Sequence, residues 1–207
     1  VGRKIMKRIA IDIGNVLTTE SPEHPKLFSS PKHLAIPSSQ EAFRAIRSMA
    51  SKISSEDCFL ISRCNEGNEV KITDWLNHHD FFEFTAFRTQ NVFFCGKREN
   101  KKEIAEKLKI THFIDDRWTV LKHIEEVSTL IRAFLINPQE EELTSWKSSN
   151  SQKTILCESW DQIEKEIYAN QAAHTTPASA PRCPPRMALT LGRNGEPKRT
   201  QVELKQT

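Results

Sequence analysis

The chain has 207 residues, of which 37% are hydrophobic and 28% are charged, with 30 Lys and Arg against 27 Asp and Glu. This balance is typical of one globular domain with its own core, and it excludes fibrous and wholly disordered chains. No apolar run approaches the roughly 20 residues of a membrane span, and the run after the basic N-terminus is too short for a signal peptide, so we expect a cytoplasmic protein without membrane partners.

The first 170 residues alternate between apolar runs and amphipathic segments. Each apolar run is nearly continuous in hydrophobic residues, which is typical of strands that are covered on both faces. The runs predict about six strands, at 9–13, 58–61, 92–95, 113–114 with its flanks, 131–136 and 154–157.

Helical periods lie between several of these runs. The first covers residues 42–53, and Ser38 and Glu41 before it have the spacing of a capping box. Because strands and helices alternate, we predict an α/β domain with a doubly wound parallel sheet and helices on both faces. Two further helical periods lie at 120–127 and at 160–167, the latter behind a capping box of Ser159 and Gln162.

Two segments depart from this alternation. Residues 18–37 contain four prolines and no helical period, which predicts a long loop over one edge of the sheet. Residues 171–207 contain five of the ten prolines, six basic and two acidic residues, and we predict that they form a disordered basic tail outside the domain at 1–170. Because its basic residues are scattered, the tail does not favour a nucleic-acid partner.

Polar and charged residues follow four of the predicted strands. In an open parallel sheet, ligands bind at the carboxyl ends of the strands. Carboxylate oxygens suit Mg²⁺, while a hydroxyl and an ammonium group can hold phosphoryl oxygens, so the set predicts a site for a phosphate together with Mg²⁺. The residues are Asp12, Gly14 and Asn15 after the first strand, Ser62 after the second, Lys101 and Lys102 past the third, and Asp115 and Asp116 after the fourth.

Each candidate also has an ordinary structural interpretation. Asp12 could be a strand-end turn residue, although an ionised group within an apolar strand is costly unless it is paired or bound to metal. Ser62 could cap the following helix. Asn100 has the position of a helix cap, which places Lys101 and Lys102 in the first helical turn. Because the helix dipole disfavours cations there, this placement indicates a functional role for one of the two lysines.

The aspartate pair at 115–116 directly follows the fourth apolar run. One of its carboxylates should face the site while the other caps a helix that runs from Arg117 onward. The sequence leaves open which of Asp115 and Asp116 would bind a metal. Cys64 follows the second strand without an adjacent base, so we interpret it as a bystander.

Four short motifs in this order resemble those of the haloacid dehalogenase (HAD) superfamily, and the likeness spans roughly residues 8–168. The resemblance implies that Asp12 is a nucleophile that forms an aspartyl-phosphate, with Lys101 as its catalytic partner. It also implies that Ser62 and Lys101 bind the phosphate, and that Asp115 or Asp116 holds Mg²⁺ together with Asp12. The motifs are Ile-Asp-Ile-Gly-Asn-Val-Leu at 11–17, Phe-Leu-Ile-Ser at 59–62, Lys101 at a helix start, and His-Phe-Ile-Asp-Asp-Arg at 112–117.

One position departs from the pattern of HAD phosphatases. They carry a second aspartate two positions after the nucleophile, which protonates the leaving group and then activates water, and this chain has Gly14 there. Gly14 could still offer its backbone carbonyl to Mg²⁺. The first hypothesis is therefore a Mg²⁺-dependent phosphohydrolase in which Glu20 or His24 replaces the missing acid.

The second hypothesis is a catalytically impaired HAD-like module that binds a phosphorylated ligand or a protein partner. The segment at 18–37 is too short for the large cap domain of many HAD members. We therefore expect an open site that admits a phosphorylated small molecule or macromolecule.

Overall fold

The computed structural model describes residues 6–19 and 27–172. The chain divides into two units, Val1–Asn170 and Gln171–Thr207, and nearly all described residues belong to the first. The tail at 171–207 was predicted to be disordered, but its first two residues end a helix that spans Trp160–Ala172. The rest of the tail, 173–207, lies outside the described residues. Among the described helices, none has the length and apolar character that crossing a bilayer requires.

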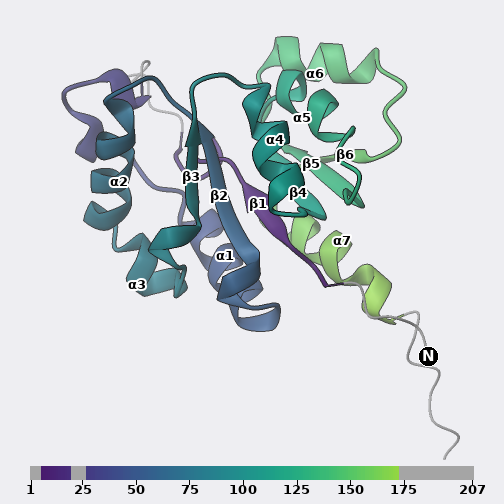
Figure 1. Ribbon diagram of the computed structural model, residues 1–207, viewed down its shortest axis with the longest axis horizontal. Helices are drawn as coiled ribbons and strands as arrows, with labels where there is room; N and C mark the ends of the chain where they lie inside the picture. Colours follow the sequence, from purple (N-terminus) through teal and green to yellow (C-terminus); the bar gives the residue numbers. More distant parts are fainter. Residues whose placement is uncertain (1–5, 20–26, 173–207) are drawn as a thin grey trace, which may run out of the picture. The chain divides into compact units, whose positions relative to one another are not determined.

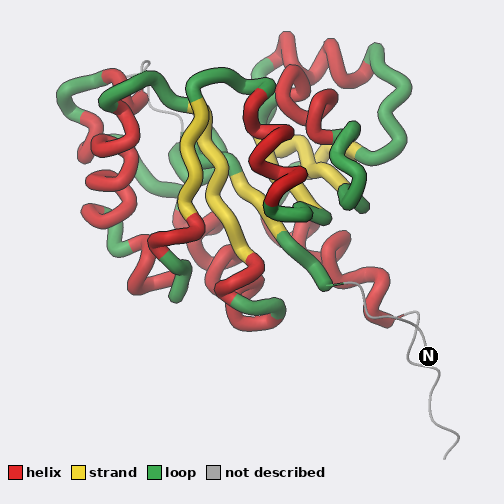
Figure 2. Tube along the Cα trace, viewed as in Figure 1, coloured by secondary structure: helices red, strands yellow, loops and turns green. Residues whose placement is uncertain are grey.

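Six parallel strands form one sheet in the order β3-β2-β1-β4-β5-β6 (Figure 1). Each strand coincides with one of the six predicted apolar runs, which confirms the predicted α/β fold class. Figure 2 shows the helical segments that separate these strands along the chain. The strands are β1 (Ile9–Ile11), β2 (Cys58–Arg63), β3 (Val92–Cys95), β4 (His112–Asp115), β5 (Arg132–Ile136) and β6 (Thr154–Cys157).

Side chains of the central strand β1 contribute to two separate cores. Ile9 and Ile11 belong to the core cluster that also contains the apolar faces of α1 (Gln40–Lys52) and α7 (Trp160–Ala172). Ala10 points to the opposite face, where α4 (Asn100–Lys107) and α5 (Trp118–Ile124) pack. Since successive strand residues alternate between faces, helices on both sides explain why every position of β1 is apolar.

Helices α1, α5 and α7 correspond to the three predicted helical periods, whereas three other helices were not predicted. The unpredicted helices have weaker signals: α3 is a single short helix, and α2 and α6 expose most of their residues to solvent. The three are α2 (Asn68–His78), α3 (Phe81–Thr85) and α6 (Glu140–Lys147).

The predicted helix caps are correct at α7 and displaced by one residue elsewhere. Ser159 accepts a hydrogen bond from the backbone N–H of Gln162, as predicted. At α1, however, Ser39 and not Ser38 caps the helix, because its hydroxyl accepts from the N–H of Ala42 at 3.2 Å. At α4, Asn100 is the first helical residue and not the cap. Adjacent polar residues are equivalent in a sequence pattern, so only backbone geometry selects between them.

The described part of the long loop at 18–37 packs against α2 and does not form a simple cover over a sheet edge. It contains two single-turn 3-10 helices, Leu27–Ser29 and His33–Ala35. The indole N–H of Trp75 in α2 donates to the carbonyl of Ile36 at 2.8 Å. Thr18 forms an antiparallel bridge with Ser38, which closes the base of the loop beside β1.

Candidate active site

The sheet topology places three of the predicted site residues at neighbouring strand ends. After β1 the chain continues to β2 and β3 on one side of β1, and it later adds β4 on the other side. Crevices at such a reversal are where open α/β sheets bind ligands. Asp12 directly follows β1, and its backbone N–H donates to the Ile114 carbonyl of β4 at 2.9 Å. Ser62 is the second-to-last residue of β2, and Asp115 is the last residue of β4.

A tight turn after β1 brings Asn15 back to the strand ends. Asn15 has a positive φ of 56°, a conformation that asparagine tolerates better than most residues. Its backbone N–H donates to the Thr18 hydroxyl at 3.0 Å, and its side-chain amide donates to Oδ2 of Asp116, also at 3.0 Å. The turn therefore links the end of β1 to the end of β4.

Lys101 is the buried cation of the site. Its side chain is almost fully buried, and its Nζ donates to Oδ1 of Asp12 at 2.8 Å and to Oδ2 of Asp115 at 2.7 Å. Burial alone would lower the pKa of this ammonium group, but Asp115 and Asp12 outweigh burial and raise the pKa. Lys101 is thus charged despite lying in the first turn of α4, where the helix dipole opposes a cation.

The neighbouring Lys102 lies in the same turn of α4, as predicted, but has a different environment. It is partly exposed, and its Nζ lies 2.5 Å from Oε2 of the exposed Glu126. Of the two lysines, only Lys101 reaches the strand ends.

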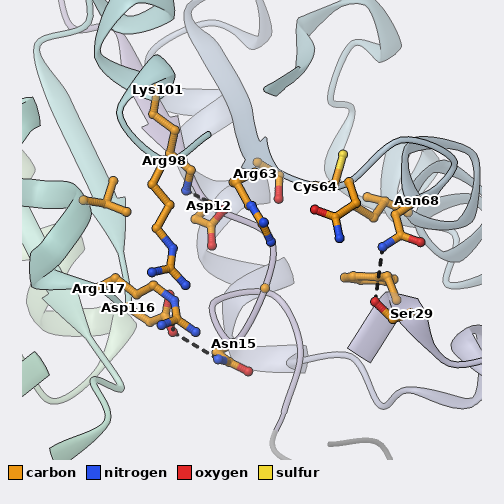
Figure 3. A pocket seen from close by; sticks show the side chains of 16 residues that line it. Asp12, Asn15, Ser29, Arg63, Cys64, Asn68, Arg98, Lys101, Asp116 and Arg117 are labelled. Atoms are coloured by element: carbon orange, nitrogen blue, oxygen red, sulfur yellow. Dashed lines mark hydrogen bonds and ion pairs between the residues drawn. The ribbon is translucent and has the colours of Figure 1, made fainter. Parts of the chain in front are cut away.

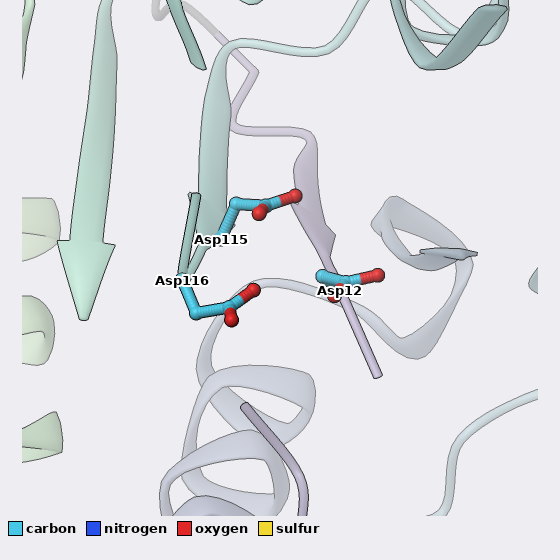
Figure 4. Close-up of side chains that lie close together, drawn as sticks. All are labelled: Asp12, Asp115 and Asp116. Atoms are coloured by element: carbon cyan, nitrogen blue, oxygen red, sulfur yellow. The ribbon is translucent and has the colours of Figure 1, made fainter. Parts of the chain in front are cut away.

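Asp115, the last residue of β4, and Asp116, which follows it, differ in how many of their oxygens are engaged. Figure 4 shows both side chains near Asp12. Asp115 is fully buried, with Oδ2 bound to Lys101 and Oδ1 accepting from the backbone N–H of Arg117 at 2.9 Å. Asp116 accepts from Asn15 through Oδ2, and no hydrogen bond to its Oδ1 occurs among the described residues. Neither aspartate caps α5 in the predicted way. The helix begins at Trp118, and the backbone N–H that donates to Asp115 belongs to Arg117, one residue before the helix.

The three carboxylates form the one cluster of potential metal ligands found among the described residues. Ligand oxygens of Asp12, Asp115 and Asp116 all lie within 4.8 Å of one another. Burial and the neighbouring carboxylates raise the pKa of Asp116 to about 8. Burial also raises the pKa of Asp115, to about 6, although Lys101 opposes this shift. Such crowding stores repulsion that a bound cation would relieve, and oxygen ligands of this kind suit Mg²⁺.

Ser62 lies within β2 and is buried. The alternative that it caps the following helix is wrong, because α2 begins six residues later, after Gly67. The Cys64 thiol beyond it is also buried, and burial raises its pKa to about 11, so it is protonated at neutral pH. This agrees with the interpretation of Cys64 as a bystander.

A cavity of about 180 Å³ opens over these strand ends (Figure 3). Among the predicted site residues, Asp12, Gly14, Ser62, Lys101 and Asp116 line it, whereas Asp115 lies behind the lining. Asn15 of the predicted strand-end set and the bystander Cys64 also line the cavity. The other lining residues had no predicted role, and they are Phe28, Ser29, Arg63, Asn65, Asn68, Ile72, Arg98, Arg117 and Val120.

A positional signal was present for some of the missed residues. Arg63 directly follows Ser62 at the carboxyl end of β2, and Arg98 lies in the loop between β3 and α4. Both therefore follow the carboxyl end of a strand, which is where ligands bind in an open parallel sheet. No such signal exists for Ser29, which comes from the long loop and reaches the cavity through its contact with α2, where Asn68 donates to its hydroxyl at 3.3 Å.

Solved structures resemble this arrangement of strands and helices. D,D-heptose 1,7-bisphosphate phosphatase from B. bronchiseptica, complexed with magnesium and phosphate, superposes with a TM-score of 0.57 at 13% identity, over 80% of this chain and 99% of the other. The chain has the HAD-like fold. A protein described as a haloacid dehalogenase-like hydrolase from Burkholderia xenovorans LB400 gives a TM-score of 0.53 at 10% identity, over 78% of this chain and 97% of the other. No protein-family profile and no curated protein sequence matches the chain.

Among the described residues, the cavity has no replacement for the second aspartate that HAD phosphatases carry. Gly14 lines the cavity, and the carboxylates in the described lining are Asp12 and Asp116. The candidates Glu20 and His24 lie outside the described residues. The described arrangement can hold an oxyanion against a buried ammonium group and bind a divalent cation with carboxylate oxygens.

Proposed function

We propose that this protein is a Mg²⁺-dependent phosphohydrolase that cleaves a phosphate ester through an aspartyl-phosphate on Asp12. The observation that carries the proposal is the convergence of Asp12, Ser62, Lys101 and Asp116 on one cavity at the carboxyl ends of parallel strands. A bare structural ion pair would not require a serine hydroxyl and a second carboxylate beside it on an accessible cavity wall.

Mg²⁺ would be held by Asp12 and Asp116, with the backbone carbonyl of Gly14 as a further ligand. This assignment follows from the engaged oxygens, because Asp115 already uses one oxygen for Lys101 and the other for the backbone of Arg117. Asp115 then acts as a positioning residue for Lys101. The cation supplies positive charge that stabilises the charge developing on the phosphoryl oxygens.

The protein residues would perform the reaction in two steps. A carboxylate oxygen of Asp12 attacks phosphorus, the new Asp12–phosphate bond forms, and the bond to the ester oxygen breaks. Lys101 and the Ser62 hydroxyl hold the phosphoryl oxygens during this step. Water then attacks the aspartyl-phosphate, which releases phosphate and restores the carboxylate.

The ester oxygen must take up a proton when it leaves, and the residue that supplies it decides how fast the protein works. Positioned general acids and bases contribute about 10²- to 10⁴-fold to such rates. The described cavity lining has Gly14 where the family has this acid. That observation favours a second candidate function, a module that binds phosphorylated ligands and turns them over slowly or not at all.

The two candidates are separated by an assay of the full chain against a panel of phosphate esters, with and without Mg²⁺. We expect phosphate release that depends on Mg²⁺ and is lost in Asp12→Asn. Lys101→Met should also lose activity, whereas Lys102→Met should keep it, because Lys102 lies outside the cavity in the same helical turn.

Activity that persists unchanged in Asp12→Asn would refute the nucleophile. Binding of phosphate esters without release of phosphate would favour the binding module. Acid quench of a reaction with ³²P-labelled substrate would detect the aspartyl-phosphate directly, and its absence from an active enzyme would exclude the covalent route.

A further inference from the structure

The described lining of the cavity carries more positive charge than one phosphate group needs. Among the residues that the structure describes, four cationic and two carboxylate side chains line the cavity, and their formal charges sum to +2 before a metal binds. Asp115 behind the lining lowers this surplus by one, and a bound Mg²⁺ would raise it by two. A single phosphate monoester brings at most two negative charges, which leaves positive charge uncompensated.

The surplus is located at Arg63 and Arg98. Lys101 is committed to two aspartates, and Arg117 lies 3.9 Å from Asp116 and 3.7 Å from Glu142. By contrast, neither Arg63 nor Arg98 forms an ion pair or a hydrogen bond through its guanidinium group within the described ranges. Both are solvent-exposed residues that nonetheless line the cavity.

The two arginines reach the cavity from different elements. Arg63 leaves the end of β2 beside Ser62, and Arg98 comes from the loop that precedes α4. Figure 3 shows both side chains extending into the cavity that Asp12 lines. Because the phosphate-binding roles near Asp12 are already filled by Lys101 and Ser62, the two guanidinium groups are available to a different part of the ligand.

Guanidinium groups bind phosphate in particular. Their planar fork of donors matches two phosphate oxygens at once, and they remain charged at any physiological pH. The lining of the cavity also offers neutral amides, Asn65 and Asn68, which suit the hydroxyl groups of a sugar.

We propose that the substrate is a small phosphate ester whose leaving group carries a second phosphate, and that Arg63 and Arg98 bind this second phosphate. The proposal rests on the proposed phosphohydrolase function, since it names the substrate class of the same site. Arg63 and Arg98 are specificity residues, and the reacting phosphate is held by other side chains.

The test compares matched substrates that differ by one phosphate. Fructose 6-phosphate is paired with fructose 1,6-bisphosphate, and adenosine 5′-monophosphate with adenosine 3′,5′-bisphosphate, so the arms also distinguish sugar from nucleotide scaffolds. The full chain is assayed with Mg²⁺ as wild type, Arg63→Gln and Arg98→Gln. Lys97→Gln is the control, because Lys97 is exposed beside Arg98 and does not line the cavity.

We expect the wild type to prefer the bisphosphate of at least one pair by about tenfold or more in kcat/KM, as charge-assisted hydrogen bonds to phosphate would give. Each arginine variant should lower this preference by about the same factor, mainly through KM, and Lys97→Gln should retain it. An equal loss on both members of a pair would overturn the proposal, since the arginines would then serve the reacting phosphate.

Failure of this proposal is distinguishable from failure of the proposed function. Hydrolysis of monophosphates and bisphosphates at equal kcat/KM would overturn the proposal and leave the phosphohydrolase standing. If the wild type hydrolyses none of the four compounds, calorimetric titration with the same compounds tests the second phosphate site by binding. Tighter binding of a bisphosphate that is lost in Arg63→Gln and Arg98→Gln would support the second phosphate site, and equal binding of both members of each pair would overturn it.

Discussion

Replacing Lys101 by methionine tests how the strand ends are held together, because Lys102 provides a matched control. The Lys101 ammonium is buried and lies 2.7 Å from Asp115 and 2.8 Å from Asp12. Lys102 follows it in the same helical turn, but its Nζ pairs with exposed Glu126. Methionine keeps most of the side-chain length and removes the charge, so the two variants differ only in the environment of the lost ammonium group.

The expected magnitude follows from what the missing ammonium leaves behind. Asp12 and Asp115 would keep carboxylate oxygens within 4.8 Å of each other without their shared cation. Removing one partner of a buried ion pair costs roughly 3 to 5 kcal/mol. We expect Lys101→Met to lose stability in that range at pH 8 without divalent metal. Lys102→Met should unfold at the wild-type denaturant concentration, because exposed ion pairs contribute little.

The cost should shrink as the pH falls. Burial already raises the folded-state pKa of Asp115 to about 6 in the presence of Lys101, and loss of Lys101 would raise it further. When the pKa of a carboxyl group is higher in the folded than in the unfolded state, the folded state binds more protons at any pH between the two values, of which the unfolded one is about 4. Folding is then stabilised as the pH falls through this window. The variant therefore gains stability relative to wild type on acidification, and its deficit at pH 5 should be clearly smaller than at pH 8.

Urea denaturation followed by circular dichroism, at both pH values and with EDTA, measures these differences. Equal losses in Lys101→Met and Lys102→Met would refute the role of the buried ammonium. A deficit at pH 5 that equals or exceeds the deficit at pH 8 would refute the electrostatic reasoning, and an equal deficit would mean that the cost comes from packing alone.

Three further predictions concern the metal site, a buried histidine and the loop contact. Mg²⁺ at 100 times its dissociation constant should stabilise the protein by about 2.7 kcal/mol. In thermal denaturation Asp116→Asn should lose this gain and Asp115→Asn should keep it; the reverse pattern would assign the metal to Asp115. Between pH 6.5 and 4, wild type should lose about 3 kcal/mol more stability than His112→Gln, because burial and two nearby cations lower the pKa of His112 to about 4 and the unfolded chain takes up the proton first. Parallel pH profiles of the two proteins would contradict this assignment. Trp75→Phe should cost about 1 to 2 kcal/mol in urea denaturation, since its indole N–H donates to a buried carbonyl, and an unchanged midpoint would show that this contact contributes nothing.

Local patterns in the sequence were sufficient for the sheet and its main helices. A strand that is covered on both faces must be apolar at nearly every position, so β1 to β6 are visible as continuous apolar runs without knowledge of their partners. Helix α1 is visible because one of its faces is buried along its whole length. Helices α2 and α6 were missed because most of their residues are exposed, which leaves only a weak period.

The sequence by itself also selected the strand-end residues, because their position after an apolar run is a local property. It could not decide between Asp115 and Asp116, since both follow β4 directly. Tertiary contacts distinguish the two aspartates, because Lys101 and the backbone of Arg117 occupy the oxygens of Asp115, while Asp116 lines the cavity.

Only the tertiary structure decided which charges remain uncompensated. Lys101 and Lys102 are neighbours of the same residue type, yet one is buried between two carboxylates and the other pairs at the surface. Arg63 and Arg98 are 35 positions apart in the sequence and meet at one cavity because the parallel strands β2 and β3 pair side by side. Charge balance in a site is a sum over side chains brought together by strand order, so the local sequence does not contain it.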